Sequence, residues 1–280
     1  MSEQTYSLNG KIVAITGGAG GIGMATSRAL SRAGAKVSIG DLNHAAAEEA
    51  ADSLGHGNLG GRVDVTDAES FEAWIERTEA EMGPIDVLIN NAGVMILGAF
   101  EEESDDAAAL TIAVNLTGVI NGSKIAIRRM KPRGRGRIVN IASQAGKAGF
   151  PGGATYCATK FAVVGLSDAI RNELHGTGVG VTTVMPGPVE TELGAGLGKA
   201  RGVELLKPEE VADSIVRAIA KGESEVFLPR FTPLITKPIS LLPAKGRDFV
   251  LRAMNADKVL TDVDGKRRAE YEKNAGTPGV

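Results

Sequence analysis

The chain has 280 residues, a formal net charge of −3, 43% hydrophobic residues and 23% charged residues. This length and composition predict one large globular domain, and the slightly acidic charge gives no electrostatic reason to expect a nucleic-acid partner. A single cysteine, Cys157, excludes an intrachain disulfide, and with only three scattered histidines we expect no metal site.

The start of the chain, residues 1–9, is short and polar and lacks the basic and apolar regions of a signal peptide. No run of about 18 apolar residues follows, so we expect no membrane-spanning helix. A lone cysteine also fits a reducing compartment. Together these features predict a cytoplasmic protein.

A short apolar run, residues 11–16, leads directly into a glycine turn that contains Gly17, Gly21 and Gly23, and a helical pattern begins near Ile22. Such a run suits a strand buried on both faces of a parallel sheet. Glycines between a strand and a helix let the backbone approach a pyrophosphate, and the helix N-terminus attracts its negative charge. We therefore predict a dinucleotide phosphate site here.

The second expected strand, residues 36–40, ends at Asp41, 24 residues after Gly17. A carboxylate at this place can accept hydrogen bonds from the two ribose hydroxyls of NAD and would repel the 2′-phosphate of NADP. No Arg or Lys lies in the glycine turn, and the residue after the aspartate is Leu42 rather than a basic residue. The absence of a basic side chain at both places favours NAD over NADP. The alternative is that Asp41 caps the helix that starts near Asn43.

A third strand is expected over about residues 61–65, where the carboxylate of Asp64, next to Val65, would lie near the adenine end of a cofactor. A fourth, residues 85–89, runs into the polar turn 90–93. Open α/β sheets bind ligands at the carboxyl ends of their strands. Strands separated by helices predict a Rossmann-type, doubly wound parallel sheet with helices on both faces.

A long helix is expected over residues 104–130, with Asn115 inside it. Its amide competes for backbone groups, so it either holds a water at a local kink or is simply tolerated. The fifth strand, residues 137–142, delivers Ser143 to its carboxyl end. No nearby histidine or G-x-S-x-G turn would make Ser143 a nucleophile, so we interpret it as a hydrogen-bond donor to a substrate oxygen.

A tyrosine and a lysine lie four residues apart, Tyr156 and Lys160, on a helix expected over residues 154–174. Side chains at this spacing share one helix face. A nearby cation favours the phenolate and lowers the pKa of a tyrosine, so the pair is a candidate general acid and base for an alcohol oxygen. The spacing alone also arises by chance on solvated helices, and its meaning depends on the rest of the chain.

The sixth strand, residues 179–185, ends in a turn stiffened by two prolines, residues 186–191. The glycine-rich stretch 193–206 is either a lid that closes over the site or a surface loop. A helix over 209–221 and a seventh strand over 225–228 complete a seven-stranded sheet.

The chain after the last strand divides into two parts. Residues 231–254 are apolar and basic, and they could cap the substrate pocket, form a subunit contact or rest on a membrane surface. Residues 255–280 are polar and are expected to be partly disordered. We therefore predict one domain over 1–230 that carries the sites, followed by a C-terminal extension over 231–280.

Taken together, these motifs resemble the short-chain dehydrogenase/reductase family, in the family's order and spacing over about residues 8–230. The matching stretches are Thr16-Gly17 with Gly21-Ile22-Gly23, Asp64, Asn90-Asn91-Ala92-Gly93, Asn115, Ser143, Tyr156 with Lys160, and Pro186-Gly187 with Thr191. Members of the family are usually homo-oligomers, so a dimer or tetramer is expected. The residues after 230 exceed the family's shorter members and put the usual tetramer in doubt.

The resemblance implies four catalytic residues. Tyr156 would be the acid and base, Lys160 would lower its pKa and hold the nicotinamide ribose, Ser143 would position the substrate oxygen, and Asn115 would maintain a water in a proton relay. The implied cofactor-binding residues are Gly17, Gly21, Ile22, Gly23, Asp41, Leu42, Asp64, Val65, Asn91, Ala92, Gly93, Tyr156, Lys160, Pro186, Gly187, Val189 and Thr191.

These predictions lead to an NAD-dependent oxidoreductase that interconverts a secondary alcohol and a ketone. Apolar residues flank the expected site at 94–97 and 149–151, so a mostly apolar substrate is favoured. Two alternatives stay open: an NADPH-dependent carbonyl reductase, against which Asp41 argues, and a non-catalytic dinucleotide-sensing protein on the same fold.

Overall fold

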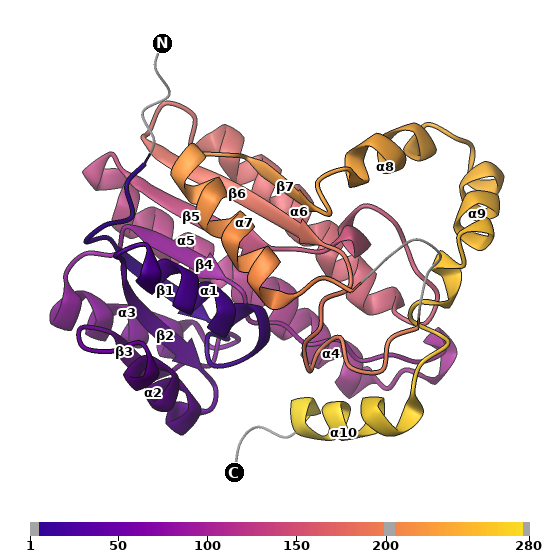
Figure 1. Cartoon of the computed structure of the whole chain (residues 1–280), viewed down its shortest axis with the longest axis horizontal. Coiled ribbons are helices and arrows are strands. Elements are labelled where there is room, and N and C mark those ends of the chain that lie inside the picture. The colour runs from indigo at the N-terminus through magenta and orange to yellow at the C-terminus, as the bar shows by residue number, and fades with distance from the viewer. Residues whose placement is uncertain (1–5, 199–204, 277–280) are drawn as a thin grey trace.

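Seven parallel strands form one sheet in the order β3-β2-β1-β4-β5-β6-β7 (Figure 1). The computed structural model describes residues 6–198 and 205–276. This is the Rossmann-type, doubly wound sheet that the sequence predicts. The strands are β1 (Ile12–Thr16), β2 (Lys36–Asp41), β3 (Leu59–Arg62), β4 (Val87–Asn90), β5 (Gly136–Ile141), β6 (Val179–Pro186) and β7 (Glu225–Leu228).

Helices cover both faces of the sheet (Figure 1). Alternate residues of β1 point to opposite faces, so Val13 and Ile15 pack with α1, α2 and α7, whereas Ile12 and Ala14 pack with α3, α5 and α6. The two apolar layers explain why the strands read as nearly continuous apolar runs. The helices are α1 (Gly21–Arg32), α2 (His44–Ser53), α3 (Ala68–Met82), α4 (Asp105–Ile112), α5 (Gly118–Met130), α6 (Ala154–Glu173) and α7 (Pro208–Lys221).

The third strand ends earlier than the sequence predicts. The expected range was 61–65, whereas β3 ends at Arg62. The reason is Asp64, whose Oδ1 accepts hydrogen bonds from the backbone N–H of Thr66 at 3.0 Å and from its hydroxyl at 2.7 Å. This local bonding turns the chain out of the sheet.

The expected long helix is interrupted by one wider turn. A π-helical segment, Ala113–Thr117, separates α4 from α5 and contains the fully buried Asn115. By length and composition alone, the run Asp105–Arg133 could cross a membrane, contrary to our expectation. Core helices pass the same test, and the inner side of α5 packs against the sheet through Ile125 and Met130.

The C-terminal segment differs most from the prediction. The part of 255–280 that the structure describes is ordered into η5 (Ala256–Lys258) and α10 (Gly265–Gly276) rather than a polar tail, and residues 277–280 lie outside the described residues. Before it, α8 (Thr232–Ser240) and α9 (Ala244–Ala253) extend beyond β7 (Figure 1).

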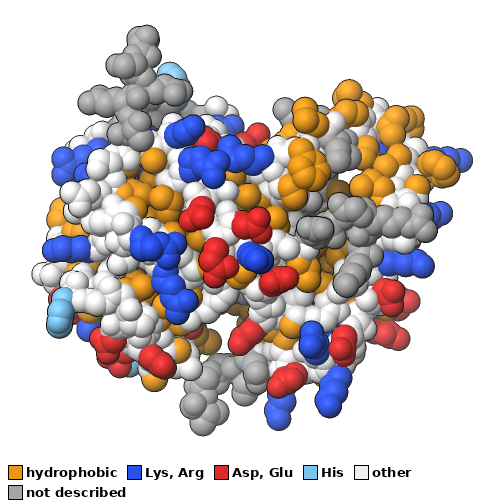
Figure 2. Space-filling model, viewed as in Figure 1, with side chains coloured by type: hydrophobic (Ala, Val, Ile, Leu, Met, Phe, Trp, Pro, Cys, Tyr) orange, Lys and Arg blue, Asp and Glu red, His pale blue; other side chains and the backbone are white. Residues whose placement is uncertain are grey.

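The outer surface of α8 and α9 is rich in exposed apolar side chains, visible as the orange group at the upper right of Figure 2. Leu234 is 79% exposed, Leu241 87% and Phe249 74%. Basic side chains, Lys245 and Arg252, are exposed beside them. A subunit contact or a membrane surface for residues 231–254 stays a prediction.

Candidate active site

The glycine turn after β1 is held in place by the loop after β4. The Asn91 side chain donates to the carbonyl oxygens of Thr16 at 3.0 Å and Gly17 at 2.9 Å. Gly17 has φ +60°, and a Cβ there would lie 2.9 Å from Cα of Ala92. A Cβ on Gly23 would lie 2.0 Å from the Gly17 carbonyl oxygen. Both positions therefore require glycine, because α1 and the two loops touch through the backbone.

One face of this turn opens onto a cavity of about 800 Å³. A Cβ on Gly20 would meet no atom within 4 Å, so the turn presents bare backbone toward open space at the start of α1. Backbone amides at a helix N-terminus beside such a cradle suit the phosphates of a dinucleotide. The predicted residues that line the cavity are Gly17, Gly21, Ile22, Asp41, Asn91, Ala92, Gly93, Ser143, Tyr156, Lys160, Pro186, Gly187, Val189 and Thr191.

Asp41 lies at the end of β2, on the cavity wall. Its carboxylate accepts hydrogen bonds from the backbone N–H of Ala19 at 3.3 Å and of Asn43 at 3.2 Å. Burial raises the pKa of Asp41, and these backbone hydrogen bonds oppose the rise. Asn43, not Asp41, caps α2, because its side chain accepts from the N–H of Ala46. The capping alternative for Asp41 is therefore wrong.

Four residues predicted for the cofactor do not line this cavity: Gly23, Leu42, Asp64 and Val65. Gly23 packs closely against the backbone of Gly17. Leu42 is 39% exposed. The Asp64 carboxylate is engaged by Thr66. Val65 is buried in the core that α3 and α5 cover. Their predicted cofactor contacts stay predictions.

Ser143 and Tyr156 face the cavity from the ends of β5 and α6. The Ser143 hydroxyl accepts a hydrogen bond from the N–H of Ala145 at 3.1 Å. Burial raises the pKa of Tyr156 to about 12, and the neighbouring Ser143 hydroxyl opposes this rise by hydrogen bonding. Serine and tyrosine thus form a pair of hydroxyls at one point of the wall.

Lys160 lies one helical turn after Tyr156 and is 6% exposed. Its Nζ donates to the carbonyl oxygen of Ile141 at 3.1 Å and lies 5.6 Å from the centre of the Tyr156 ring. Burial lowers the pKa of Lys160 to about 8. The predicted lowering of the Tyr156 pKa is not seen in this structure, since burial is the larger effect.

Asn115 uses its whole side chain within the protein. Its Oδ1 accepts from the N–H of Val94 at 2.8 Å, and its Nδ2 donates to the Val94 carbonyl at 2.8 Å and to the Thr159 hydroxyl at 3.3 Å. It is therefore more than a tolerated helix residue, since it fixes the loop after β4 against α6. A Cβ on Gly93 would lie 3.2 Å from its Oδ1 and 3.7 Å from Nζ of Lys160. The predicted water relay stays a prediction.

The turn after β6 closes the cavity opposite the glycine turn. A Cβ on Gly21 would lie 3.2 Å from Cγ2 of Thr191, so the two turns face each other closely. The Thr191 hydroxyl accepts from the N–H of Gly194 at 3.2 Å. Of the expected lid over 193–206, residues 199–204 lie outside the described residues. Residues 193–198 are bonded to the C-terminal segment, for example from the N–H of Gly198 to the Val259 carbonyl at 2.9 Å.

Several residues that line the cavity were not predicted from the sequence. Tyr271 of α10 and the apolar pair Val259 and Leu260 line it, although they lie in the segment predicted to be partly disordered. The signal was the apolar pair itself in a polar stretch, whereas nothing in the pattern around Tyr271 marks it. Charged side chains also reach the wall, more than we expected: Lys147, Glu192, Arg247 and Asp248.

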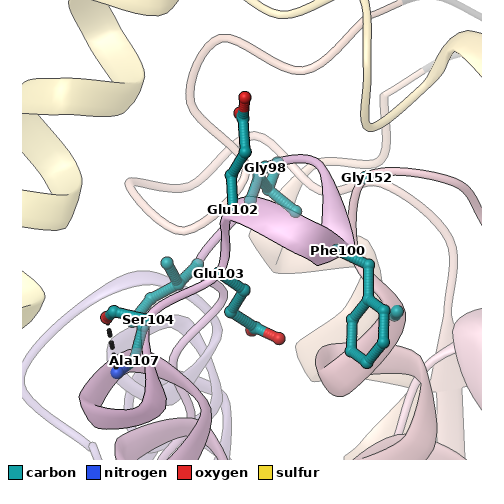
Figure 3. Close-up of a pocket in the computed structure, with 11 residues that line it drawn as sticks. Gly98, Phe100, Glu102, Glu103, Ser104, Ala107 and Gly152 are labelled. Carbon is teal, nitrogen blue, oxygen red and sulfur yellow. Dashed lines mark hydrogen bonds between the residues drawn. The ribbon is translucent and has the colours of Figure 1, made fainter.

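A smaller pocket of about 300 Å³ lies beside the loop after β4 and contains none of the predicted site residues (Figure 3). Its carboxylates, Glu102 and Glu103, point in different directions in Figure 3. Glu103 accepts a hydrogen bond from the Thr155 hydroxyl, and Ser104 caps α4. Its polar groups are therefore largely structural.

Comparison with known proteins agrees with this fold. The family model for short chain dehydrogenases matches residues 11–202, well over half of the chain. The chain therefore belongs to the short-chain dehydrogenase/reductase family, whose members are oxidoreductases that use nicotinamide cofactors.

Two curated relatives are similar over much of the chain. D-threitol dehydrogenase of Mycolicibacterium smegmatis is 41% identical over 192 residues, which cover 68% of this chain and 74% of that protein. The 2,5-dichloro-2,5-cyclohexadiene-1,4-diol dehydrogenase LinX of Sphingobium indicum is 40% identical over 191 residues, 67% of this chain and 76% of the relative. In other curated relatives, at 34% and 36% identity, the chain spans only 19% and 39% of the length.

Among solved structures, a short chain dehydrogenase/reductase from Burkholderia phymatum in complex with NAD superposes with a TM-score of 0.77 at 25% identity. The match covers 88% of this chain and 96% of that one. The likeness thus extends beyond the residues that the family model matches.

Proposed function

We propose that the protein is an NAD(H)-dependent oxidoreductase that interconverts a secondary alcohol and a ketone on a mostly apolar substrate. One observation carries the proposal: a single cavity joins the glycine turn and Asp41 to Ser143, Tyr156 and Lys160. A dinucleotide laid from Asp41 across the turn would reach the two hydroxyls. A protein that only binds a dinucleotide, without catalysing a reaction, does not require Ser143, Tyr156 and Lys160 at this place.

In oxidation, the proton of the alcohol passes to the Tyr156 phenolate, which lies at the wall of the cavity. Ser143 donates a hydrogen bond to the same alcohol oxygen and stabilises the charge that develops there. Lys160, held by the Ile141 carbonyl, places a positive charge beside the phenol ring and favours the phenolate. In reduction, the phenol gives the proton back to the carbonyl oxygen.

The glycine turn would hold the pyrophosphate of the cofactor, and Asp41 the adenosine ribose. A bound nicotinamide dinucleotide supplies the hydride acceptor in oxidation and the hydride donor in reduction. Thr191 lies beside Gly21 at the cavity wall and is proposed to hold the nicotinamide amide. The solved relatives carry NADH or NAD, which supports the cofactor proposed here.

The character of the substrate is proposed from the wall beyond Ser143 and Tyr156. Met95, Phe150 and Leu260 pack together there with Tyr156, so the reacting oxygen would sit beside an apolar surface. Two relatives are named as dehydrogenases of D-threitol and of a chlorinated cyclohexadienediol, which supports an alcohol substrate. We also propose that the extension over 231–280 acts as the cap of this pocket.

The proposal is tested by the growth of NADH absorbance with NAD⁺ and a panel of secondary alcohols from short aliphatic to steroid-sized. We expect turnover of apolar alcohols and little of sugars or charged hydroxy acids, because apolar side chains surround the reacting point. With NADP⁺ in place of NAD⁺, we expect kcat/KM at least about a hundredfold lower, since the Asp41 carboxylate repels a 2′-phosphate.

Asp41→Ala is the variant that tests the choice of cofactor. It should reduce the ratio of kcat/KM with NAD⁺ to kcat/KM with NADP⁺ and leave the order of preferred alcohols unchanged. Equal use of both nucleotides by the unaltered protein would favour the NADPH-dependent reductase instead. Tight NADH binding without turnover of any alcohol or ketone would favour the non-catalytic sensor.

The pH dependence follows from the pKa of Tyr156, raised to about 12, and that of Lys160, lowered to about 8. Oxidation needs the phenolate, whose fraction grows as pH rises, so kcat/KM for oxidation should increase from pH 6. Above pH 8 Lys160 loses its charge and its support for the phenolate, so the increase should become shallower. Reduction needs the phenol and should stay level over this range. Oxidation that falls between pH 6 and 8 would contradict the assignment of Tyr156 as base.

A further inference from the structure

The last described helix brings a second phenol to the cavity that holds Ser143 and Tyr156. Tyr271 of α10 lines the cavity wall. Its phenol oxygen accepts a hydrogen bond from the backbone N–H of Met95 at 3.2 Å. It also acts electrostatically on Tyr156, so the two phenols lie in the same part of the cavity.

A buried arginine holds this tyrosine in position. Arg268 is 3% exposed, and its guanidinium lies 4.6 Å from the centre of the Tyr271 ring. It donates to the carbonyl oxygens of Met95 and of Leu193, the latter at 2.8 Å. It also pairs with Glu272 at 3.2 Å, and Glu272 in turn accepts from a backbone N–H of the loop after β4. The contacts of Arg268 and Glu272 with the loops after β4 and β6 therefore fix the position of Tyr271, although it lies near the end of the described chain.

The hydroxyl of Tyr271 has one unused hydrogen-bonding group. Its oxygen accepts from Met95, but within residues 6–198 and 205–276 its own proton has no acceptor. Apolar side chains, Met95, Val259 and Leu260, line the same cavity as Tyr271, and the charged groups of Arg268, Glu272 and Glu192 also act on its phenol. A half-buried hydroxyl donor without an acceptor gains stability when a ligand supplies an oxygen.

We propose that Tyr271 donates a hydrogen bond to a second oxygen of the substrate, away from the oxygen held by Ser143 and Tyr156. This inference rests on the proposed alcohol dehydrogenase function and narrows its substrate class. The favoured substrates are apolar molecules with two oxygens, such as a diol or a hydroxyketone on a carbon ring or chain. Tyr271 is then a specificity-determining residue, and Arg268 is the residue that positions it.

The test compares the protein with its Tyr271→Phe variant on cyclohexanol and on the 1,2-, 1,3- and 1,4-cyclohexanediols, with NAD⁺ as cofactor. The ring is the same in all four alcohols, and only the second hydroxyl differs. We expect at least one diol to exceed cyclohexanol about tenfold in kcat/KM, mainly through a lower KM, because one neutral hydrogen bond is worth about that factor. Tyr271→Phe should remove this advantage and leave cyclohexanol within about twofold.

Tyr6→Phe is the matched control, since Tyr6 packs beside Lys11 and Arg137 and does not line the cavity. It should leave all four substrates unchanged. If Tyr271→Phe lowers diols and cyclohexanol by the same factor, Tyr271 has only a structural role and the inference is wrong. It is also wrong if no diol exceeds cyclohexanol in the unaltered protein.

Calorimetry separates this inference from the proposed function. The diols and cyclohexanol are titrated into NADH-saturated protein, with and without Tyr271→Phe. If the protein oxidises none of the alcohols, the proposed function is wrong. The inference about Tyr271 is then tested by the binding measurements alone. Tighter binding of a diol that is lost in Tyr271→Phe supports it, and equal binding of diol and cyclohexanol overturns it.

Discussion

Tyr156→Phe should lower kcat/KM by about a thousandfold in both directions, because general acid and base catalysis contributes a factor of this order. The variant keeps the aromatic ring that packs with Met95 and Leu260, so the fold and the cavity wall should persist. Only the group that moves the proton is removed. Steady-state rates with NAD⁺ and the best alcohol of the panel, and with NADH and the matching ketone, provide the measurement.

Two controls make this result specific to the site. Tyr6→Phe removes a phenol hydroxyl outside the cavity and should keep full activity. NADH binding by Tyr156→Phe, followed by fluorescence, should stay within a few-fold of the unaltered protein, because the glycine turn and Asp41 are untouched. Residual activity within tenfold would show that another group moves the proton.

Gly23→Ala should destabilise the protein by about 3 kcal/mol and greatly weaken NADH binding, as expected for a methyl group forced into close packing. The added Cβ would lie 2.0 Å from the Gly17 carbonyl oxygen and 2.8 Å from Cα of Gly18. Both are backbone atoms, so no side chain can move aside to make room. The midpoint of urea unfolding and an NADH titration measure the two effects.

Gly20→Ala, in the same turn, is the matched control. Its φ of −139° is accessible to alanine, and the added Cβ would meet no atom within 4 Å. Its unfolding free energy should therefore stay close to that of the unaltered protein. Equal destabilisation by both substitutions would contradict close packing at Gly23 as the cause, because alanine at a compatible backbone conformation lowers only the entropy of the unfolded chain.

Most of the sheet and the glycine turn could be predicted from the sequence because both depend on local patterns. The apolar run of β1, the glycines after it and Asp41 at the end of β2 lie within about 30 residues of each other. Strand ends were less predictable. At β3 the chain leaves the sheet early because a side chain, Asp64, binds the backbone two residues further on.

The C-terminal wall of the cavity could not be predicted, since the contacts that order it are distant in sequence and polar. Arg268 reads as one of several charged residues in a hydrophilic stretch. Its burial depends on carbonyl groups of Met95 and Leu193, which no local pattern brings together. The expected lowering of the Tyr156 pKa is absent for a related reason, because burial raises this pKa more than the hydrogen bond with Ser143 lowers it.

The bonds of Arg268 also set an order in which the molecule can be assembled. Its carbonyl partners, Met95 and Leu193, lie 173 and 75 positions earlier in the chain. Chains are synthesised from the N-terminus, and contacts between distant residues form late in folding. A growing chain can thus complete the glycine turn, Ser143 and Tyr156 before the wall with Tyr271 exists. We expect the nascent protein to form the part of the cavity that binds the dinucleotide first, and the wall that selects the alcohol last.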